Sequence, residues 1–176
     1  QRHGIRLTGG AQVISTGNAP GAATITLLGT GGSGNGQSPP TTDYAENHGI
    51  TVTDATTKIS SAYGDIQLTG VGGQRINGNG SSTLRGIYLA GATIESTGTG
   101  VGAADITLDG TGTPLGGQDQ GIWMHSNPSV LSKDGDISIT GRGNVGILIG
   151  SVTIKSTGTG NLQVTGEGLG GGQDIG

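Results

Sequence analysis

Apolar and polar residues alternate in short runs along the whole chain, and the runs recur in sets of three. The first run of a set follows a glycine, the second centres on one aliphatic residue, and the third ends at a Gly-x-Gly triplet. Alternation with a period of two is typical of β-strands that bury one face. No apolar stripe with a helical period lasts for three turns, so the pattern predicts strands and no helix.

The sets of strands are repeats of one unit. The stretch TIESTGTG at 93–100 returns as TIKSTGTG at 153–160 with one letter changed. Such a unit cannot bury its own apolar face and needs neighbours of the same shape. The units open at Gly4, Gly49, Gly86, Gly121 and Gly146. This spacing predicts an all-β fold, a right-handed parallel β-helix (three-stranded β-solenoid) of about five coils, as a single domain over 1–176.

No cap is recognisable at either end of the repeat pattern. Gly4 opens a unit close to the first residue, and GGQDIG at 171–176 matches, in five of six letters, the GGQDQG at 116–121 that leads into the unit at Gly121. Exposed strand edges invite pairing with further strands. We therefore expect this chain to be a segment of a longer repeat array, or to stack end to end.

Stacked coils place equivalent residues in columns along the axis, about 4.8 Å apart. The alternation predicts that the inward columns are aliphatic. These columns are Ile5, Ile50, Ile87, Ile122 and Ile147; Leu7, Val52, Leu89, Met124 and Ile149; Val13, Ile59, Ile94, Val130 and Ile154; Ile25, Ile66, Ile106, Ile137 and Leu162; and Leu27, Leu68, Leu108, Ile139 and Val164.

The composition agrees with a narrow solenoid core. The chain has 40 glycines, one tryptophan, and no phenylalanine or cysteine, so Ile, Leu and Val must fill the interior without disulfide support. We expect the glycines to mark corners that need a positive φ, and the Gly/Ser/Pro-rich insertion at 32–47 to form a surface loop. A net charge of −4 without a basic run gives little support for nucleic-acid binding, and no apolar run is long enough to span a membrane.

One outward column concentrates the large aromatic side chains. It contains Tyr88, Trp123 and Leu148, preceded by Arg6 and Thr51. A contiguous exposed apolar patch usually marks a contact surface. We predict that Tyr88, Trp123 and Leu148 form a contact stripe, which could stack sugars, pack against a neighbouring filament, or lie under a folded-over insertion.

A second column is acidic and lies just before the third strand. It contains Asp65, Asp105 and Asp136, with Thr24 and Asn161 in the equivalent positions. One interpretation is that these carboxylates accept backbone hydrogen bonds at a turn. The other is a weak Ca²⁺ site, because hard cations prefer carboxylate oxygens. No intact calcium-binding nonapeptide repeat is present, and no other cofactor is predicted.

Serines and histidines also recur, without a catalytic arrangement. A serine follows the second-strand aliphatic residue in every unit, and we expect it to bond along the stack near a corner. His3 and His48 share a column that continues with Arg85, and His125 lies at another corner; all three histidines are expected on the surface. Since no base recurs beside a serine, we predict that the protein is not an enzyme. The serine column is Ser15, Ser61, Ser96, Ser132 and Ser156.

The units GIYLAGATIESTGTG at 86–100 and ADITLDGTG at 104–112 resemble repeats of secreted bacterial β-helical proteins of the filamentous haemagglutinin type. The resemblance covers all five units. It implies an elongated, secreted protein of the cell surface or extracellular matrix that acts in adhesion and commonly leaves the cell by two-partner secretion. The amino-terminal secretion domain of that family is not recognisable here, and the resemblance supplies no catalytic motif.

The sequence therefore favours a structural or adhesive surface solenoid, elongated or filament-forming, with self-association or cell-surface and matrix glycans as partners. The alternative is a polysaccharide-binding or polysaccharide-degrading β-helix protein, for which the Asp column is the one candidate site. An ice-binding solenoid would need a regular threonine array. The outward third-strand column is too irregular for that: Thr26, Gln67, Thr107, Ser138 and Gln163.

Overall fold

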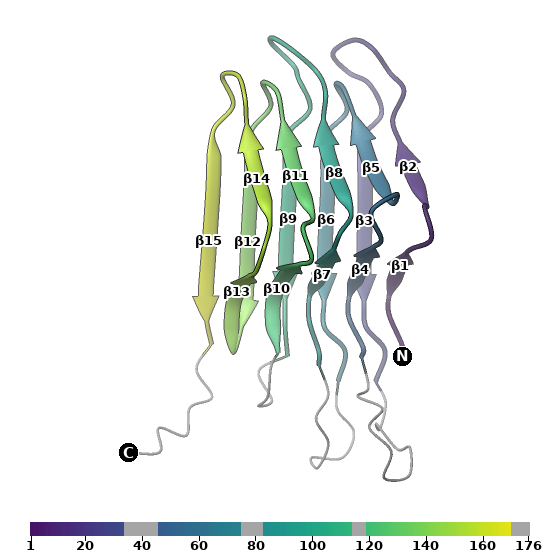
Figure 1. The fold of residues 1–176 in the computed structure, drawn as a ribbon, viewed down its shortest axis with the longest axis vertical. Coiled ribbons are helices and arrows are strands. Elements are labelled where there is room, and N and C mark those ends of the chain that lie inside the picture. Colours follow the sequence, from purple (N-terminus) through teal and green to yellow (C-terminus); the bar gives the residue numbers. More distant parts are fainter. Residues whose placement is uncertain (34–45, 75–82, 114–118, 170–176) are drawn as a thin grey trace.

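The computed structural model describes residues 1–33, 46–74, 83–113 and 119–169. This part of the chain contains fifteen β-strands, arranged as three parallel sheets of five strands each. Each sheet takes one strand from every coil, and the coils follow one another along the axis from β1 to β15 (Figure 1). The predicted three-stranded parallel β-helix of five coils is confirmed. Most of the expected surface insertion, residues 34–45, lies outside the described residues.

We name the three sheets by their order in a coil. Sheet A contains β1 (Ile5–Leu7), β4 (Ile50–Thr53), β7 (Ile87–Ala90), β10 (Gln120–His125) and β13 (Val145–Ile149). Sheet B contains β2 (Gln12–Ile14), β5 (Lys58–Ser61), β8 (Thr93–Ser96), β11 (Ser129–Ser132) and β14 (Thr153–Ser156). Sheet C contains β3 (Ile25–Thr30), β6 (Ile66–Val71), β9 (Ile106–Thr111), β12 (Ile137–Gly143) and β15 (Leu162–Gly168).

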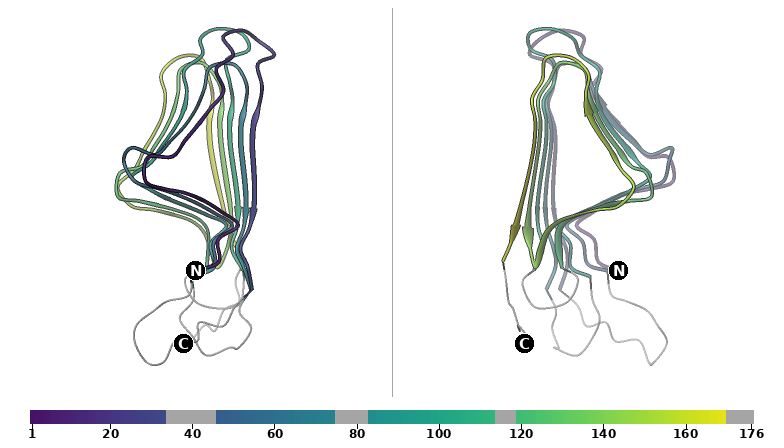
Figure 2. Two further views of the ribbon diagram at one scale, coloured as in Figure 1. Left: turned by 90° about the vertical axis from the view of Figure 1, so that its right-hand side faces the viewer. Right: turned by 60° about the vertical axis from the view of Figure 1, so that its left-hand side comes forward.

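The cross-section of the solenoid is a triangle with unequal corners (Figure 2). Sheet C forms the long straight side, and sheets A and B meet at a wide corner opposite it. Sheets C and A converge at a narrow corner, where the chain passes from one coil to the next. The three corners contain different kinds of residue, because each corner leaves a different amount of space for side chains.

The inward columns pair in the predicted register. Ile59 pairs with Ile94, which pairs with Val130, and all three side chains are buried. The aliphatic columns of the other two sheets are buried in the same way through the middle coils. In the outermost described coil the matching residues are half exposed, as for Leu162 (47%) and Val164 (44%). Each coil therefore depends on its neighbours to bury its core face.

Glycines line the narrow corner because no side chain fits there. A Cβ placed on Gly49 would lie only 2.7 Å from the carbonyl oxygens of Gly29 and Gly86, and closer still to the backbone nitrogen of Val71. The same clash recurs at Gly86 and Gly121 in the next coils. None of these glycines has a positive φ. Our expectation that glycines mark corners with a positive φ therefore does not extend to the coil-opening glycines, which serve a close approach of two backbones.

Positive φ values belong to the two other corners. Between sheets A and B they occur at Gly9 (φ 65°), Gly10 (φ 82°), Asp54 (φ 81°), Gly91 (φ 74°) and the pair Ser126 and Asn127 (φ 59° each). Asp54 is held in this conformation by two hydrogen bonds that its carboxylate accepts from the neighbouring coil, from the Thr8 hydroxyl and the Gly9 N–H, each 2.6 Å long. These bonds lower the pKa of Asp54 below its usual value, the backbone bond most. In the second coil a side-chain cap thus stands where the first and third coils have Gly9 and Gly91.

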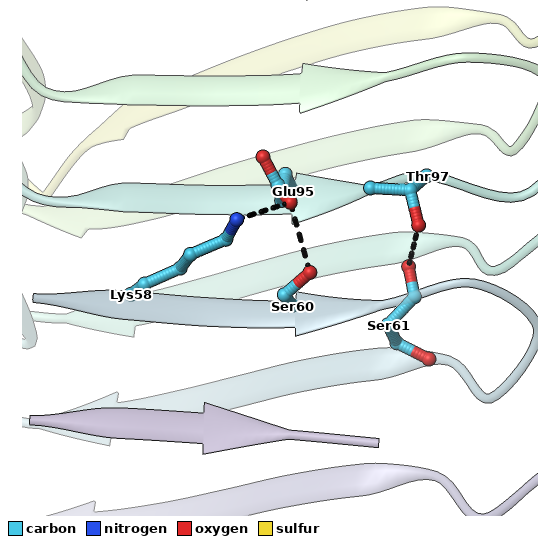
Figure 3. A network of polar contacts seen from close by, with 5 residues as sticks. All are labelled: Lys58, Ser60, Ser61, Glu95 and Thr97. Carbon is cyan, nitrogen blue, oxygen red and sulfur yellow. Dashed lines mark hydrogen bonds and ion pairs between the residues drawn. The ribbon is translucent and has the colours of Figure 1, made fainter. Parts of the chain in front are cut away.

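Polar side chains on the outer face of sheet B tie adjacent coils together (Figure 3). The Glu95 carboxylate on β8 lies 2.7 Å from Lys58 Nζ and accepts a 2.9 Å hydrogen bond from the Ser60 hydroxyl, both on β5. The Thr97 hydroxyl points to the carbonyl oxygen of Ser61, at 3.5 Å. Partly exposed ion pairs of this kind contribute about 0.2–1 kcal/mol each. They support the register but do not determine it.

Replacing Gly86 by alanine should destabilise the solenoid strongly. A Cβ at Gly86 would lie 2.6 Å from the carbonyl oxygen of Gly121 and against the backbone of Thr111, so we expect a loss of about 3 kcal/mol or more. The control is Gly21→Ala, where φ is +86° but a Cβ has no neighbour within 4 Å. That change should cost about 1 kcal/mol. Thermal unfolding followed by far-UV circular dichroism measures both, and equal shifts would contradict the close-approach explanation.

Candidate functional site on the outer face of sheet A

The predicted contact stripe forms one continuous column on sheet A. Tyr88 pairs with Trp123, and Trp123 pairs with Leu148, in successive coils. The Tyr88 and Trp123 rings are tilted against each other with centroids 5.3 Å apart. Both rings are partly buried, whereas Leu148 is 39% exposed. The stripe is therefore a packed set of side chains with accessible edges.

His125 completes the ring stack. Its imidazole stacks on Trp123 with centroids 4.2 Å apart, and its Nε2 shares a 2.5 Å hydrogen bond with the Tyr88 hydroxyl. Burial lowers the pKa of His125 and raises that of Tyr88, so both side chains are neutral at pH 7. We expected His125 at a separate corner. The missed signal was its spacing, two residues beyond Trp123 on one strand, which puts both on the same face.

Arg85 supplies the charge of this face. Its side chain is buried, its Cζ lies 4.0 Å from the centroid of the Trp123 ring and 5.3 Å from that of Tyr88, and its Nε donates a 2.7 Å hydrogen bond to Gln120 Oε1. Burial lowers the pKa of Arg85 to about 10, so it stays charged at neutral pH. A guanidinium over an indole is a favourable cation–π pair. We call Arg85, Tyr88, Trp123 and His125 the sheet A cluster.

His48 and His3 extend the stack toward the first coil. Our expectation of surface histidines is wrong for His48, which is completely buried. Its ring lies 5.1 Å from that of His3 and 5.2 Å from that of Tyr88, measured between centroids. Burial and the adjacent Arg85 lower the pKa of His48 to about 2, and burial lowers that of His3. Both histidines are therefore neutral at pH 7.

The cluster has the chemistry of a contact surface. Its rings offer partly accessible apolar edges, its one charge is buried against an indole, and its other ionisable groups are neutral at pH 7. Within residues 1–33, 46–74, 83–113 and 119–169, no three His, Asp or Glu side chains are close enough together to hold a metal ion. The arrangement suits packing against apolar or ring-bearing groups of a partner.

The Asp column forms a hydrogen-bonded ladder before the third strand of each coil. Asp65 Oδ1 accepts the backbone N–H of Asp105 at 3.0 Å, and Asp105 Oδ1 accepts that of Asp136 at 2.7 Å. Asp136 Oδ1 accepts the backbone N–H of Asn161 at 2.7 Å. This geometry matches the interpretation of carboxylates that accept backbone hydrogen bonds. The Ca²⁺ hypothesis stays a prediction, and a bound ion would share these same oxygens.

The serine column points inward, as predicted, but its bonds cross the corner instead of following the axis. The Ser132 hydroxyl donates to the carbonyl oxygen of Gly135 at 2.6 Å, and Ser61 Oγ accepts the Gly64 N–H at 3.1 Å. Each bond thus joins two residues of one coil across the corner between sheets B and C. Ser61 and Ser132 therefore stabilise that corner from inside, whereas Ser96 Oγ and Ser156 Oγ have no hydrogen-bond partner among the described residues.

Comparison of the chain with protein-family models, with characterised proteins and with solved structures found no match. The resemblance to filamentous haemagglutinin-type repeats therefore stays a prediction. In the part of the chain that the structure covers, no helix is long and apolar enough to cross a membrane.

Two substitutions at Asp105 separate the two interpretations of the Asp column. Asp105→Ala removes the acceptor for the Asp136 N–H, and we expect a loss of about 1 kcal/mol. Asp105→Asn keeps an acceptor oxygen and should stay close to the parent protein. Thermal melts with CaCl₂ and with EDTA check the metal: under the ladder interpretation, neither addition moves the melting temperature. A stabilisation by Ca²⁺ that Asp105→Asn abolishes would establish the calcium site instead.

Proposed function

We propose that this chain is part of an elongated, secreted surface protein that acts by adhesive contact along its faces, with the sheet A cluster and Leu148 as the contact surface. The supporting observation is that Tyr88, Trp123 and Leu148 lie in one column across three successive coils. Leu148, at the end of this column, is exposed. The proposal involves no catalytic step. An extracellular and bacterial setting follows from the resemblance in the repeat sequence alone.

The energetics of such a surface depend on repetition. Burying an aromatic or leucine side chain against a partner contributes roughly 1.5–3 kcal/mol. Two or three such residues give a weak contact, because association also costs translational and side-chain freedom. Copies of the same stripe along an axis would bind together, and linked contacts strengthen binding by orders of magnitude without new chemistry. A parallel solenoid favours such an arrangement because it aligns the equivalent outward residues of successive coils in one column, as it does for Tyr88, Trp123 and Leu148.

Self-association belongs to the same proposal. The outermost described coils carry half-exposed inward aliphatics such as Leu162 and Val164, and their strands have one unpaired edge within the described residues. A further coil of the same register, whichever chain supplies it, would cover these side chains and pair these edges. Contact along the axis would lengthen the stack, and contact through sheet A would join stacks side by side.

The double variant Trp123→Ser with Leu148→Ser tests the contact surface. It keeps Tyr88 and the inward columns, so the coils should remain stacked. We expect retention on immobilised matrix glycans, or lateral self-association measured by sedimentation velocity, to fall at least tenfold, because 1.4 kcal/mol corresponds to a factor of ten. Either readout suffices, since the proposal concerns the surface and leaves the partner open.

The matched control is Leu28→Ser, which removes an outward leucine that is 70% exposed on sheet C. It should leave binding and association unchanged. If the control weakens binding as much as the double variant does, the sheet A face is not the contact surface. If the parent protein releases new reducing ends from polysaccharides, the alternative of a polysaccharide-degrading β-helix replaces the non-catalytic proposal.

A further inference from the structure

The column before the coil-opening glycines contains three stacked groups that can carry positive charge. His3, His48 and Arg85 occupy equivalent positions in the first three coils, and Gln120 follows in the fourth. In-register stacking holds such groups about 4.8 Å apart. At neutral pH only Arg85 of these three groups is charged. Protonation of both histidines would put three positive charges in a row.

The contacts of His48 with Arg85 disfavour protonation of the His48 ring. The backbone N–H of Arg85 points at His48 Nδ1 at 3.4 Å, and its guanidinium Nη1 lies 3.3 Å from His48 Nε2. Arginine and the backbone amide have only hydrogens to donate, and a protonated imidazole also has only donors. Both ring nitrogens of His48 therefore face donors, which favours the unprotonated ring whichever tautomer it adopts.

The neighbouring charges do not reverse the lowering of the histidine pKa values. Glu46 raises the pKa of His3, but burial and Arg6 act in the opposite direction on that ring, and Arg85 and His3 both lower the pKa of His48. Asp119, which lies near Arg85, accepts a 3.0 Å hydrogen bond from the backbone N–H of Leu84. Within the described ranges, the titratable or charged groups around the column are Gln1 at its amine, Arg6, Glu46, Arg85, Tyr88, Asp119 and, beside Arg85 and Tyr88, His125.

The backbone bonds that join these coils begin at the same residues. The Gly4 N–H donates to the His48 carbonyl oxygen at 3.0 Å, and the Gly49 N–H donates to the Arg85 carbonyl oxygen at 3.0 Å. Repulsion among the side chains of this column therefore acts directly on the bonds that attach β1 to β4 and β4 to β7. Sheets C and A touch here through glycine backbones, and two further side chains bond across adjacent coils: Asn47 Oδ1 accepts the Arg2 N–H and Asp119 Oδ1 accepts the Leu84 N–H, each at 3.0 Å.

We propose that the His3–His48–Arg85 column is an acid-sensitive latch, which at neutral pH holds the first two coils to the third at the narrow corner and releases them when the histidines become protonated. The direction follows from linkage. A histidine in the opened corner titrates near pH 6.5, whereas His48 in the closed corner stays neutral far below that, so the open form binds more protons. Closure is fully favoured above pH 6.5 and weakens about tenfold for each unit below it, for each histidine involved.

Release would also change the sheet A cluster. The His48 ring packs at a tilt against that of Tyr88, with centroids 5.2 Å apart. Opening the corner therefore exposes more of the Tyr88 ring, and with it the Arg85 guanidinium. This consequence is separate from the contact proposal, because the latch can be measured on the backbone without any partner.

Amide hydrogen exchange measured by NMR tests the latch. The probes are the Gly4 and Gly49 amides at the latch and the Ile137 amide, which bonds to the Asn161 carbonyl oxygen far from it. Exchange is expressed as protection factors, so that the intrinsic pH dependence cancels. Between pH 7.5 and pH 4.5 we expect protection at Gly49 to fall about a hundredfold or more relative to Ile137.

Three variants make the test specific. His48→Gln places in the second coil the residue that the fourth coil already has at Gln120, and should remove at least tenfold of the drop. Arg85→Gln removes the fixed charge and should shift the loss of protection to lower pH; it also serves if His48→Gln is unstable. His125→Gln removes a histidine outside the column and should leave the drop unchanged. An undiminished drop in both His48→Gln and Arg85→Gln, or no drop in the parent protein, would overturn the proposal.

Discussion

The contact on which the solenoid depends is the one between sheets C and A, where two backbones meet without side chains. Gly29 faces Gly49, and Gly70 faces Gly86, each pair so close that a single methyl group would overlap a carbonyl oxygen. This approach closes the triangle of each coil and brings its end next to the start of the following coil. It also fixes the width of the core, which is filled by branched aliphatics in place of aromatic rings.

The glycine corner has a direct consequence for the polar residues beside it. Since no side chain can enter the corner, the residues just before the coil-opening glycines must lie on the outer face of sheet A. Arg85 consequently covers the Tyr88 and Trp123 rings, and His48 stacks against Tyr88. These are the most buried ionisable side chains of that face, and burial keeps His48 neutral. The candidate contact surface and the acid-sensitive column thus have one structural origin.

Parallel stacking in register brings like residues together. The consequence differs between aliphatic and charged columns. Aliphatic columns gain from it, because each residue packs on two of its own kind. Acidic residues in a column would repel one another, but Asp65, Asp105 and Asp136 each use an oxygen to accept the next coil's backbone N–H. On sheet B, Glu95 forms an ion pair with Lys58, which lies two residues before its register partner Ser60 in the adjacent coil. Charge is thus tolerated where a donor lies within reach along the axis.

The sequence by itself determined the three-stranded coil, the register and the inward columns. Ile59, Ile94 and Val130 could be aligned in advance because period-two alternation and repetition in sequence leave one way to bury every apolar face. Only the tertiary structure decided that Arg85 lies over Trp123, that His125 bonds to Tyr88, and that His48 is buried. These contacts join residues of different coils through side-chain directions at a corner. A column alignment gives the height of a residue along the axis, but the direction of its side chain depends on the space that the neighbouring backbones leave.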